Sequence, residues 1–217
     1  MAFLELDNVH FTYPKAKQEI IRGVSIIIEK GEAVALMGPN ASGKTTIGKI
    51  MVGIYKPTKG RVMLNDRDIS QYNLGEVGKK IGYIFQNPEK QLFSPTVEEE
   101  IGFGLHFRGM KEELIQEKVE EMLIYFDLVP KRKEFPFNLS QGEKQRLAMA
   151  AAFALEPDFM IMDEPTTGLD VKRKNKLIEL LFKVKAKGTG YMVISHDDEF
   201  CKRVADRILF LKDGRIS

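Results

Sequence analysis

The sequence predicts an α/β fold, in which a mostly parallel sheet has helices between its strands. Apolar runs bounded by polar or glycine-rich residues are typical of buried parallel strands. Four segments have this pattern: Ala33–Met37, Ile81–Phe85, Phe159–Met162 and Tyr191–Ile194. Helical stretches, including Lys44–Ile54 and Lys172–Lys185, lie between them. Such alternation indicates a parallel sheet, whose ligands bind beyond the carboxyl ends of the strands.

Two regions depart from this alternation. The first contains β segments without helices, at Phe3–Asp7, Ile20–Ile28 and Arg61–Leu64, and predicts a small antiparallel sheet. The second, residues 96–135, has a helical pattern. Thr96 and Glu99 fit a capping box, and one apolar stripe at helical spacing consists of Ile115, Val119, Met122 and Phe126. We expect one domain over residues 1–217, with a core at 1–86 and 157–217 and an inserted helical subdomain at 87–156.

The composition of the chain excludes some broad classes of function. Its 33 basic and 31 acidic residues give a net charge of +2, which argues against a large electrostatic surface for nucleic acid. Cys201 is the only cysteine, so the sequence offers no internal disulfide. Residues 1–7 lack the order of a signal peptide, and no apolar run approaches the roughly 20 residues that span a bilayer. We expect a cytoplasmic protein that reaches any membrane through a partner.

The segment "GPNASGKTT" fits the phosphate-binding pattern G-x-x-x-x-G-K-[ST]. It follows a predicted strand and opens a predicted helix, which is the context that a P-loop requires. Its residues are Gly38, Pro39, Asn40, Ala41, Ser42, Gly43, Lys44, Thr45 and Thr46. Backbone N–H groups would surround the β-phosphate, Lys44 would reach the β- and γ-phosphates, and the Thr45 hydroxyl would ligate Mg²⁺. The sequence therefore predicts a nucleotide-binding P-loop NTPase core.

Three further polar side chains follow predicted strands. Asp163 and Glu164 follow the apolar run in "FMIMDEP", and His196 follows "YMVIS". Asp163 would hold Mg²⁺ through a water, and Glu164 would polarise the attacking water as a general base. A P-loop kinase has no special need for Glu164, because its nucleophile arrives with the substrate, so this second acid favours hydrolysis. We expect His196 to hydrogen-bond the γ-phosphate or the attacking water, and we assign catalytic roles to Glu164, His196 and Lys44.

A second helix start that attracts anions lies at "LSQGE". Ser140 and Glu143 fit a capping box, which accounts for both residues. Capping does not explain Gly142, since glycine inside a helix costs up to about 1 kcal/mol unless something must approach it closely. The P-loop surrounds its phosphate on one side only. A second helix start could enclose the open side of the phosphate if it came from another molecule.

Together these segments resemble the ATP-binding-cassette (ABC) ATPases, and the resemblance covers essentially the whole chain. "LSQGE" is similar to the signature motif of that family. Tyr13 in "FTYP" matches the aromatic residue that stacks on adenine, and Gln86 after "IGYIF" matches the glutamine that senses Mg²⁺ and the γ-phosphate. Residues 168–170 (Gly-Leu-Asp, ending at Asp170) match the loop that crosses the dimer interface, and His196 matches the switch histidine.

The resemblance implies a head-to-tail dimer with a second ABC ATPase subunit, either the same chain or a paralogue. Two ATP molecules would lie between the P-loop of one subunit and the signature residues of the other, which here are Ser140, Gln141, Gly142 and Glu143. Mg²⁺ would be held by Thr45, Gln86 and Asp163. Gln141 departs from the family, which usually has glycine there, and its side chain is tolerated if it points away from the nucleotide. Ala41 also stands where glycine is common, but alanine is small.

A narrower resemblance lies in "FQNPEKQLFSPTVEEEIGFG", residues 85–104. This segment is similar to the ATPase subunits of energy-coupling-factor (ECF) importers, which include vitamin uptake systems and cobalt or nickel uptake systems. In those subunits a short helix here contacts a transmembrane coupling protein, which implies that Pro88, Gln91, Leu92 and Phe93 lie near a membrane partner. The chain would then work at the cytoplasmic face of the cell membrane. Such subunits commonly continue into a C-terminal extension beyond the point that corresponds to Ser217.

The residues leave three functions to compare. The first is a transport motor, in which ATP closes the dimer, hydrolysis opens it, and the movement drives a membrane subunit. The second is an ABC-type ATPase that acts on DNA or ribosomes, against which the single cassette and the short insert without sustained heptads argue. The third is a nucleotide sensor without hydrolysis, against which Glu164 and His196 argue. We expect the transport motor, with no nucleic acid partner.

Overall fold

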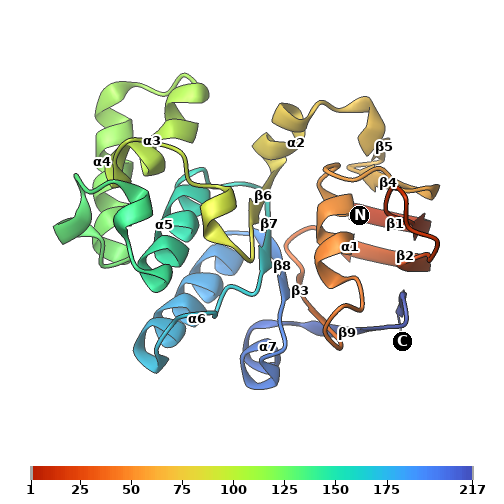
Figure 1. The fold of residues 1–217 in the computed structure, drawn as a ribbon. Helices are drawn as coiled ribbons and strands as arrows, with labels where there is room; N and C mark the ends of the chain where they lie inside the picture. Colours follow the sequence, from red (N-terminus) through yellow and green to blue (C-terminus); the bar gives the residue numbers. More distant parts are fainter. Residues whose placement is uncertain (1, 217) are drawn as a thin grey trace.

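A computed structural model describes residues 2–216, and the strands among them form two sheets (Figure 1). The larger sheet has the strand order β10-β9-β3-β8-β7-β6. Its strands are β3 (Ala33–Met37), β6 (Ile81–Ile84), β7 (Phe159–Asp163), β8 (Gly190–Ile194), β9 (Arg207–Lys212) and β10 (Arg215–Ile216). All pairings are parallel except that of β10 with β9. The predicted mostly parallel sheet is confirmed, and β9 and β10 extend it beyond the four strands expected.

The smaller sheet is antiparallel, as predicted, with the order β2-β1-β4-β5. It consists of β1 (Ala2–Phe11), β2 (Ile21–Glu29), β4 (Lys59–Leu64) and β5 (Arg67–Asp68). Strand β1 continues four residues past Asp7, where the sequence analysis ended it. A bulge explains the difference, because Asn8 has a φ of 48° and the register shifts between Leu6 and Val9. This shift interrupts the alternation of apolar and polar residues that marks a strand.

The helices connect and cover these strands. They are α1 (Lys44–Met51), α2 (Leu74–Lys80), α3 (Val97–Phe107), α4 (Glu112–Tyr125), α5 (Gln141–Ala154), α6 (Val171–Ala186) and α7 (Asp198–Val204). Short 3₁₀ turns are η1 (Ile69–Gln71), η2 (Pro88–Lys90), η3 (Val129–Lys131) and η4 (Pro136–Asn138). Helix α1 ends three residues before the predicted Ile54, since Gly53 takes a φ of 73° that breaks the helix. Thr96 caps α3 by accepting from the Glu99 backbone N–H, which is one half of the predicted capping box.

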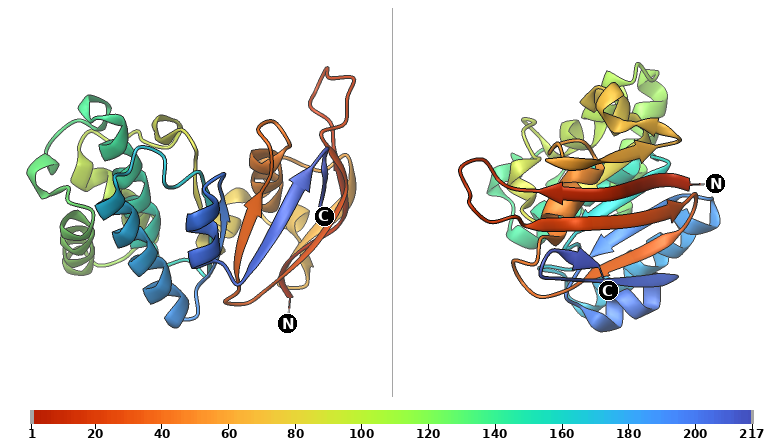
Figure 2. Two further views of the ribbon diagram at one scale, coloured as in Figure 1. Left: turned by 90° about the horizontal axis from the view of Figure 1, so that it is seen from below. Right: turned by 90° about the vertical axis from the view of Figure 1, so that its right-hand side faces the viewer.

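The parallel sheet is the middle layer of the molecule, with helices on one face and the antiparallel sheet beyond the other (Figure 2). Alternate residues of β3 divide between the two cores: Ala33 and Ala35 pack with the helical side, and Val34 and Leu36 pack with α1 and the antiparallel sheet. Both cores consist of buried apolar side chains and include residues of the parallel sheet. The carboxyl ends of β3, β7 and β8 therefore have a rigid support on both faces.

Helices α3, α4 and α5 lie side by side at one end of the molecule (Figure 1). The predicted stripe of α4 faces this group, since Ile115, Val119, Met122 and Phe126 are each at most 5% exposed. These residues join the same core as the helical face of the parallel sheet. Across residues 2–216, no helix combines the length and the apolar character needed to cross a membrane.

Candidate nucleotide-binding site

The loop between β3 and α1 depends on two glycines that have no space for a side chain. Gly38 has a φ of 147°, and a Cβ there would lie 2.1 Å from the carbonyl oxygen of Leu211. Gly43 has a φ of 104°, and a Cβ there would lie 2.7 Å from Cδ1 of Ile21. The loop then enters α1, whose first N–H groups donate no hydrogen bond to a capping side chain. Such a helix start favours an anion through its free N–H groups and its dipole.

Lys44 is held over this loop by the loop's own backbone. Its Nζ donates to the carbonyl oxygens of Gly38 at 2.8 Å and Pro39 at 2.9 Å, and the residue is only 8% exposed. The ammonium group is therefore already fixed beside the helix start. An incoming phosphate oxygen would replace or join these two carbonyl acceptors, because an ammonium group has three N–H donors.

One pocket of about 440 Å³ gathers most of the predicted site. Its walls consist of Tyr13, Ile20, Asn40, Ala41, Gly43, Lys44, Thr45, Thr46, Gln86, Asp163 and Glu164. Four segments that are far apart in the sequence meet here: the β1–β2 connection, the P-loop, the end of β6 and the end of β7. Ser42 and Pro39 face a neighbouring pocket of about 300 Å³ instead.

Tyr13 is fixed at the wall of this pocket by polar and aromatic contacts. Its hydroxyl lies 2.8 Å from Oγ1 of Thr46, the last residue of the P-loop pattern. Its ring meets Phe11 and Tyr55 edge to face, with centroids 5.0 and 5.6 Å apart. Tyr55 was not singled out in the sequence, because it follows a helix rather than any phosphate-binding pattern. The cluster presents an aromatic wall next to the helix start, where a nucleotide base could lie.

The two carboxylates reach the pocket because β7 ends in a sharp turn. Asp163 is 1% exposed and Glu164 is 7% exposed. Glu164 has a φ of 53°, in the left-handed region, and its N–H donates to the carbonyl oxygen of Ile194 at 2.8 Å. Adjacent residues of a continuing strand would face opposite sides of the sheet. The left-handed turn, which costs about 1–2 kcal/mol for a residue with a Cβ, lets both side chains line one pocket.

The surroundings of Asp163 fit a divalent cation. Burial raises the pKa of Asp163, while a hydrogen bond with Thr45 and the charges of Lys49 and Lys44 act in the opposite direction. Its Oδ2 is buried and has no hydrogen-bond partner among the described residues. Oxygen ligands of this type suit Mg²⁺. Thr45 and Gln86 line the same pocket as Asp163 and would be further ligands together with phosphate oxygens. Within residues 2–216, no group of three or more His, Cys, Asp or Glu side chains is placed to hold a metal.

Glu164 is oriented by the two residues that follow β8. Nδ1 of His196 lies 3.0 Å from both carboxylate oxygens, and the Ser195 hydroxyl donates to Oε2 at 3.2 Å. Ser195 is fully buried, whereas the His196 side chain is 73% exposed. The sequence analysis assigned His196 but not Ser195. The signal for Ser195 was its place at the end of a buried strand parallel to β7.

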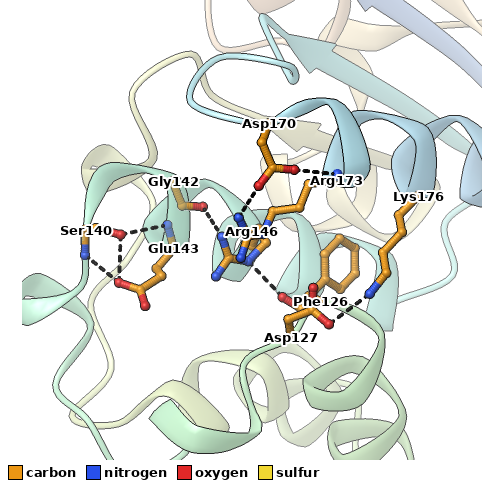
Figure 3. A network of polar contacts seen from close by, with 9 residues as sticks. All are labelled: Phe126, Asp127, Ser140, Gly142, Glu143, Arg146, Asp170, Arg173 and Lys176. Atoms are coloured by element: carbon orange, nitrogen blue, oxygen red, sulfur yellow. Dashed lines mark hydrogen bonds and ion pairs between the residues drawn. The ribbon is translucent and has the colours of Figure 1, made fainter.

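The signature residues and Asp170 do not line this pocket. Ser140 and Glu143 form the predicted capping box, in which Glu143 Oε2 accepts from the Ser140 N–H at 2.8 Å (Figure 3). Hydrogen bonds from Ser140 also lower the pKa of Glu143. Gln141 is exposed. Asp170 caps α6 by accepting from the Arg173 N–H at 2.8 Å.

The close approach that Gly142 requires is present within the chain itself. A Cβ at Gly142 would lie 2.8 Å from the carbonyl oxygen of Gly168, so no larger residue fits. The sequence analysis attributed this glycine to a ligand from another molecule. The contact with Gly168 is an additional reason that the sequence did not reveal.

Comparison with known proteins connects this site to a family. Residues 21–167 match the family model described as ABC transporter. The chain belongs to the ABC transporter family. The domain is an ABC ATPase, and its pocket brings the P-loop, Gln86 and the two carboxylates together in one place.

Curated relatives of this ABC domain include ATP-binding subunits of transporters. The energy-coupling factor transporter ATP-binding proteins EcfA of Methanothermobacter thermautotrophicus and Methanocaldococcus jannaschii are 37% and 35% identical over 98% and 100% of the chain. The chain covers 69% and 78% of those two proteins. Relatives from Methanosarcina acetivorans and Caldanaerobacter subterraneus are 40% and 38% identical, but the chain spans only 32% and 37% of their length.

Solved structures share the fold of the ABC domain. A dimeric ATP-binding cassette, MJ0796, in a post-hydrolysis state with ADP and Pi, is 31% identical with a TM-score of 0.89, over 99% of this chain and 96% of that one. CbiO1 from Clostridium perfringens, part of the ABC transporter complex cbiONQ, is 28% identical with a TM-score of 0.84, over 100% of this chain and 87% of that one.

The segment expected to meet a membrane partner is largely turned inward. Pro88 and Leu92 are buried, and Gln91 accepts from the Phe85 N–H at 3.2 Å and donates to the Ala148 carbonyl at 3.4 Å. Of the four predicted residues, Phe93 presents an exposed side chain (59%). Two of the four side chains are therefore buried, and Gln91, which is partly buried, also lines the groove described next.

Phe93 borders a largely apolar groove of about 400 Å³ between α2, α3 and α5. Its ring lies edge to face with Phe103, with centroids 4.6 Å apart. Further apolar walls are Ile54, Leu74, Phe85, Ala151, Ala152 and Leu155. One buried carboxylate, Glu100, also lines the groove, and its Oε2 accepts from the N–H groups of Phe93 at 2.9 Å and Ser94 at 2.7 Å.

Proposed function

We propose that this chain is the ATP-hydrolysing motor subunit of an ABC-type importer of the ECF class. The observation that carries the proposal is Glu164, a buried carboxylate turned toward the P-loop and oriented by Ser195 and His196. The EcfA relatives and CbiO1, which is part of the ABC transporter complex cbiONQ, favour the ECF class. All of the relatives and structures reported above are transporter proteins or ATP-binding cassettes by name, so they give no support to an ATPase that acts on DNA or ribosomes.

In this proposal ATP lies in the 440 Å³ pocket with its phosphates at the start of α1. Lys44 binds the β- and γ-phosphates, and Tyr13 supports the base. Glu164 accepts a proton from the attacking water while Ser195 and His196 hold its carboxylate in place. Mg²⁺ would be held by Thr45, Gln86 and Asp163, where it would neutralise the charge that develops on the phosphates.

The site is incomplete in one chain, because Ser140–Glu143 and Asp170 lie outside the pocket that holds the P-loop. We infer that a second ABC ATPase subunit supplies these residues, as the dimeric form of MJ0796 supports. The exposed position of Gln141 is compatible with a helix start that receives a phosphate, since its side chain need not enter the N-terminal N–H cluster.

The groove beside Phe93 and Phe103 is the proposed contact with a transmembrane coupling subunit. It is large, open and mainly apolar, which suits a short amphipathic helix. Glu100 is a buried acidic group whose Oε2 accepts from two backbone N–H groups, so an arginine or lysine on that helix would complement its charge. The transported substrate would be a vitamin or a transition-metal ion, and the protein would work at the cytoplasmic face of the membrane.

The experiment that tests this function is ATP hydrolysis and dimerisation of Glu164→Gln. The amide cannot accept the proton, so we expect turnover to fall by about 100-fold or more while ATP binding persists. Size-exclusion chromatography with ATP and Mg²⁺ should then show a trapped dimer. Asp198→Asn, at an exposed position beside the same sheet end, is the matched control. A variant with full turnover contradicts the proposal, and one that stays monomeric with ATP contradicts a site shared between two copies of this chain.

A further inference from the structure

Arg146 is a buried arginine of α5 that contacts the end of α4 and the first turn of its own helix (Figure 3). The residue is 7% exposed and belongs to α5, one turn beyond Gly142. Its Nε donates to the carbonyl oxygen of Phe126, at the end of α4, at 2.8 Å. Its Nη1 donates to the carbonyl oxygen of Gly142, in the first turn of α5, at 3.4 Å. Both acceptors are backbone groups, so Arg146 fixes the path of the chain rather than neutralising a carboxylate.

The first turn of α5 is also in contact with the loop before α6. The carbonyl oxygen of Gly168 approaches Gly142 so closely that a Cβ there would lie 2.8 Å away. Gly168 itself has a φ of 75°, which favours glycine. A Cβ at Gly142 would also lie 4.0 Å from Nη1 of Arg146, so Gly168 and the guanidinium both approach this glycine. Two parts of the surface offered to a second chain, the signature turn and the loop that ends at Asp170, are in direct contact.

The charges around Arg146 keep this arrangement compact. Arg173 forms an ion pair with Asp170 at the start of α6, and Lys176 donates to Asp127 at 2.8 Å, which joins α6 to the end of α4. Burial, together with the nearby charge of Arg173, lowers the pKa of Arg146, whereas Glu143, Asp127 and Asp170 favour its charged form. The Lys176–Asp127 pair connects α4 to α6 without touching Gly142, so it provides a comparison for Arg146.

We propose that Arg146 is a positioning residue for the ATP site of the neighbouring subunit. It holds the turn Ser140–Gly142 against the loop 166–170. Both segments therefore keep a fixed relative position where they contact the nucleotide of the partner subunit. Only a guanidinium reaches the Phe126 and Gly142 carbonyls together, because its N–H donors have a fixed fork geometry that an ammonium lacks. The inference rests on the proposed function, in which two chains share each site. Its new content is that the effect of Arg146 is exerted across the interface.

Mixtures of two variants test this directly. One chain carries Lys44→Ala and supplies an intact signature turn without a functional P-loop. It is present in large excess over a chain with a normal P-loop, so almost every normal P-loop faces the signature turn of a Lys44→Ala chain. Arg146→Lys is then placed either in the Lys44→Ala chain, where it borders the complete site, or in the other chain, where it borders the inactive one.

We expect Arg146→Lys in the Lys44→Ala chain to lower turnover per normal P-loop about tenfold or more, because small displacements of a positioned group have large effects on rate. In the other chain it should change turnover by less than about twofold. Arg146→Met serves as a second variant, and Lys176→Met in the Lys44→Ala chain is the matched control, with no expected loss. Binding of a fluorescent ATP analogue to Arg146→Lys in the chain that keeps Lys44 checks that this change leaves the P-loop of its own chain intact.

Ser140→Tyr in the Lys44→Ala chain separates this inference from the proposed function. If Ser140→Tyr lowers turnover and Arg146→Lys does not, the role of Arg146 is overturned while the shared site stands. If neither change lowers turnover, the shared site fails and the inference fails with it. Equal losses from both placements of Arg146→Lys would show a general structural effect and would also overturn the inference.

Discussion

Nδ1 of His196 lies 3.0 Å from both oxygens of the Glu164 carboxylate, which makes the exposed imidazole part of the support of the buried acid. A carboxylate accepts hydrogen bonds, so Nδ1 carries a proton in this contact. In the neutral imidazole Nε2 is then an acceptor, and it can donate to a phosphate oxygen only after a second proton binds. A water molecule, which can donate to Nε2, is therefore the natural partner of neutral His196.

This geometry predicts different effects for the two residues that hold Glu164. His196→Ala removes a contact to both carboxylate oxygens, and we expect kcat to fall about 100-fold with little change in ATP affinity. Ser195→Ala removes one longer hydrogen bond, at 3.2 Å, and should reduce kcat by less than about tenfold. Steady-state ATPase assays with separate binding measurements check both. A large loss of ATP affinity in either variant, or a greater loss of kcat from Ser195→Ala, would contradict these roles.

The charged side chain of Asp163 is predicted to lower the free energy of unfolding of the protein. Burial raises its pKa in the folded protein, so the charged form is less favourable there than in the unfolded chain. The cost is absent at a pH below the ordinary pKa of aspartate, appears as pH rises, and is complete above the raised pKa. We expect Asp163→Asn to raise the free energy of unfolding at neutral pH while ATP hydrolysis is lost. Urea denaturation without nucleotide should show this gain shrinking toward about pH 4.

The control for this prediction is Asp158→Asn, just before the same strand and exposed. It should leave the free energy of unfolding nearly unchanged at each pH. If Asp163→Asn were less stable than the natural protein at neutral pH, the hydrogen bond with Thr45 and the nearby lysines would outweigh the burial of the carboxylate.

Local patterns were sufficient for much of this fold and site. The P-loop and the end of β7 could be found because short segments, each next to a buried apolar strand, encode them directly. Ser195, Tyr55 and the Gly142–Gly168 contact could not be found in this way, because each depends on which distant segment becomes a neighbour after folding. The inward position of Leu92 was missed for a related reason. An apolar residue in a loop gives no sign of whether it faces the core or a partner.

The P-loop contains two positions whose backbone angles predict opposite responses to substitution. Gly38→Ala places a Cβ 2.1 Å from the Leu211 carbonyl oxygen, and it should destabilise the protein by about 2–3 kcal/mol. Ala41 has a φ of 62°, so Ala41→Gly removes a left-handed penalty of about 1–2 kcal/mol and adds roughly 0.4–1 kcal/mol of unfolded-state entropy. A small net stabilisation is expected for Ala41→Gly. Urea denaturation of both variants checks the signs, and destabilisation by Ala41→Gly would show that the alanine methyl group makes a favourable contact.

Leu92 and Phe93 are adjacent, but truncating them is predicted to have different effects. Leu92→Ala should mainly reduce stability, and Phe93→Ala should mainly reduce transport. Leu92 is 4% exposed and joins the helical core, so Leu92→Ala should lower the free energy of unfolding by about 2–4 kcal/mol. Phe93 is 59% exposed and loses mainly its edge-to-face contact with Phe103, so Phe93→Ala should cost less than about 1 kcal/mol. We expect Phe93→Ala to keep the basal ATPase rate and to lose transport, because its ring borders the groove proposed for the membrane subunit. Denaturation, ATPase and transport assays on the reconstituted complex separate the two cases. Equal losses of ATPase and transport in Phe93→Ala would assign Phe93 to packing and move the membrane contact elsewhere.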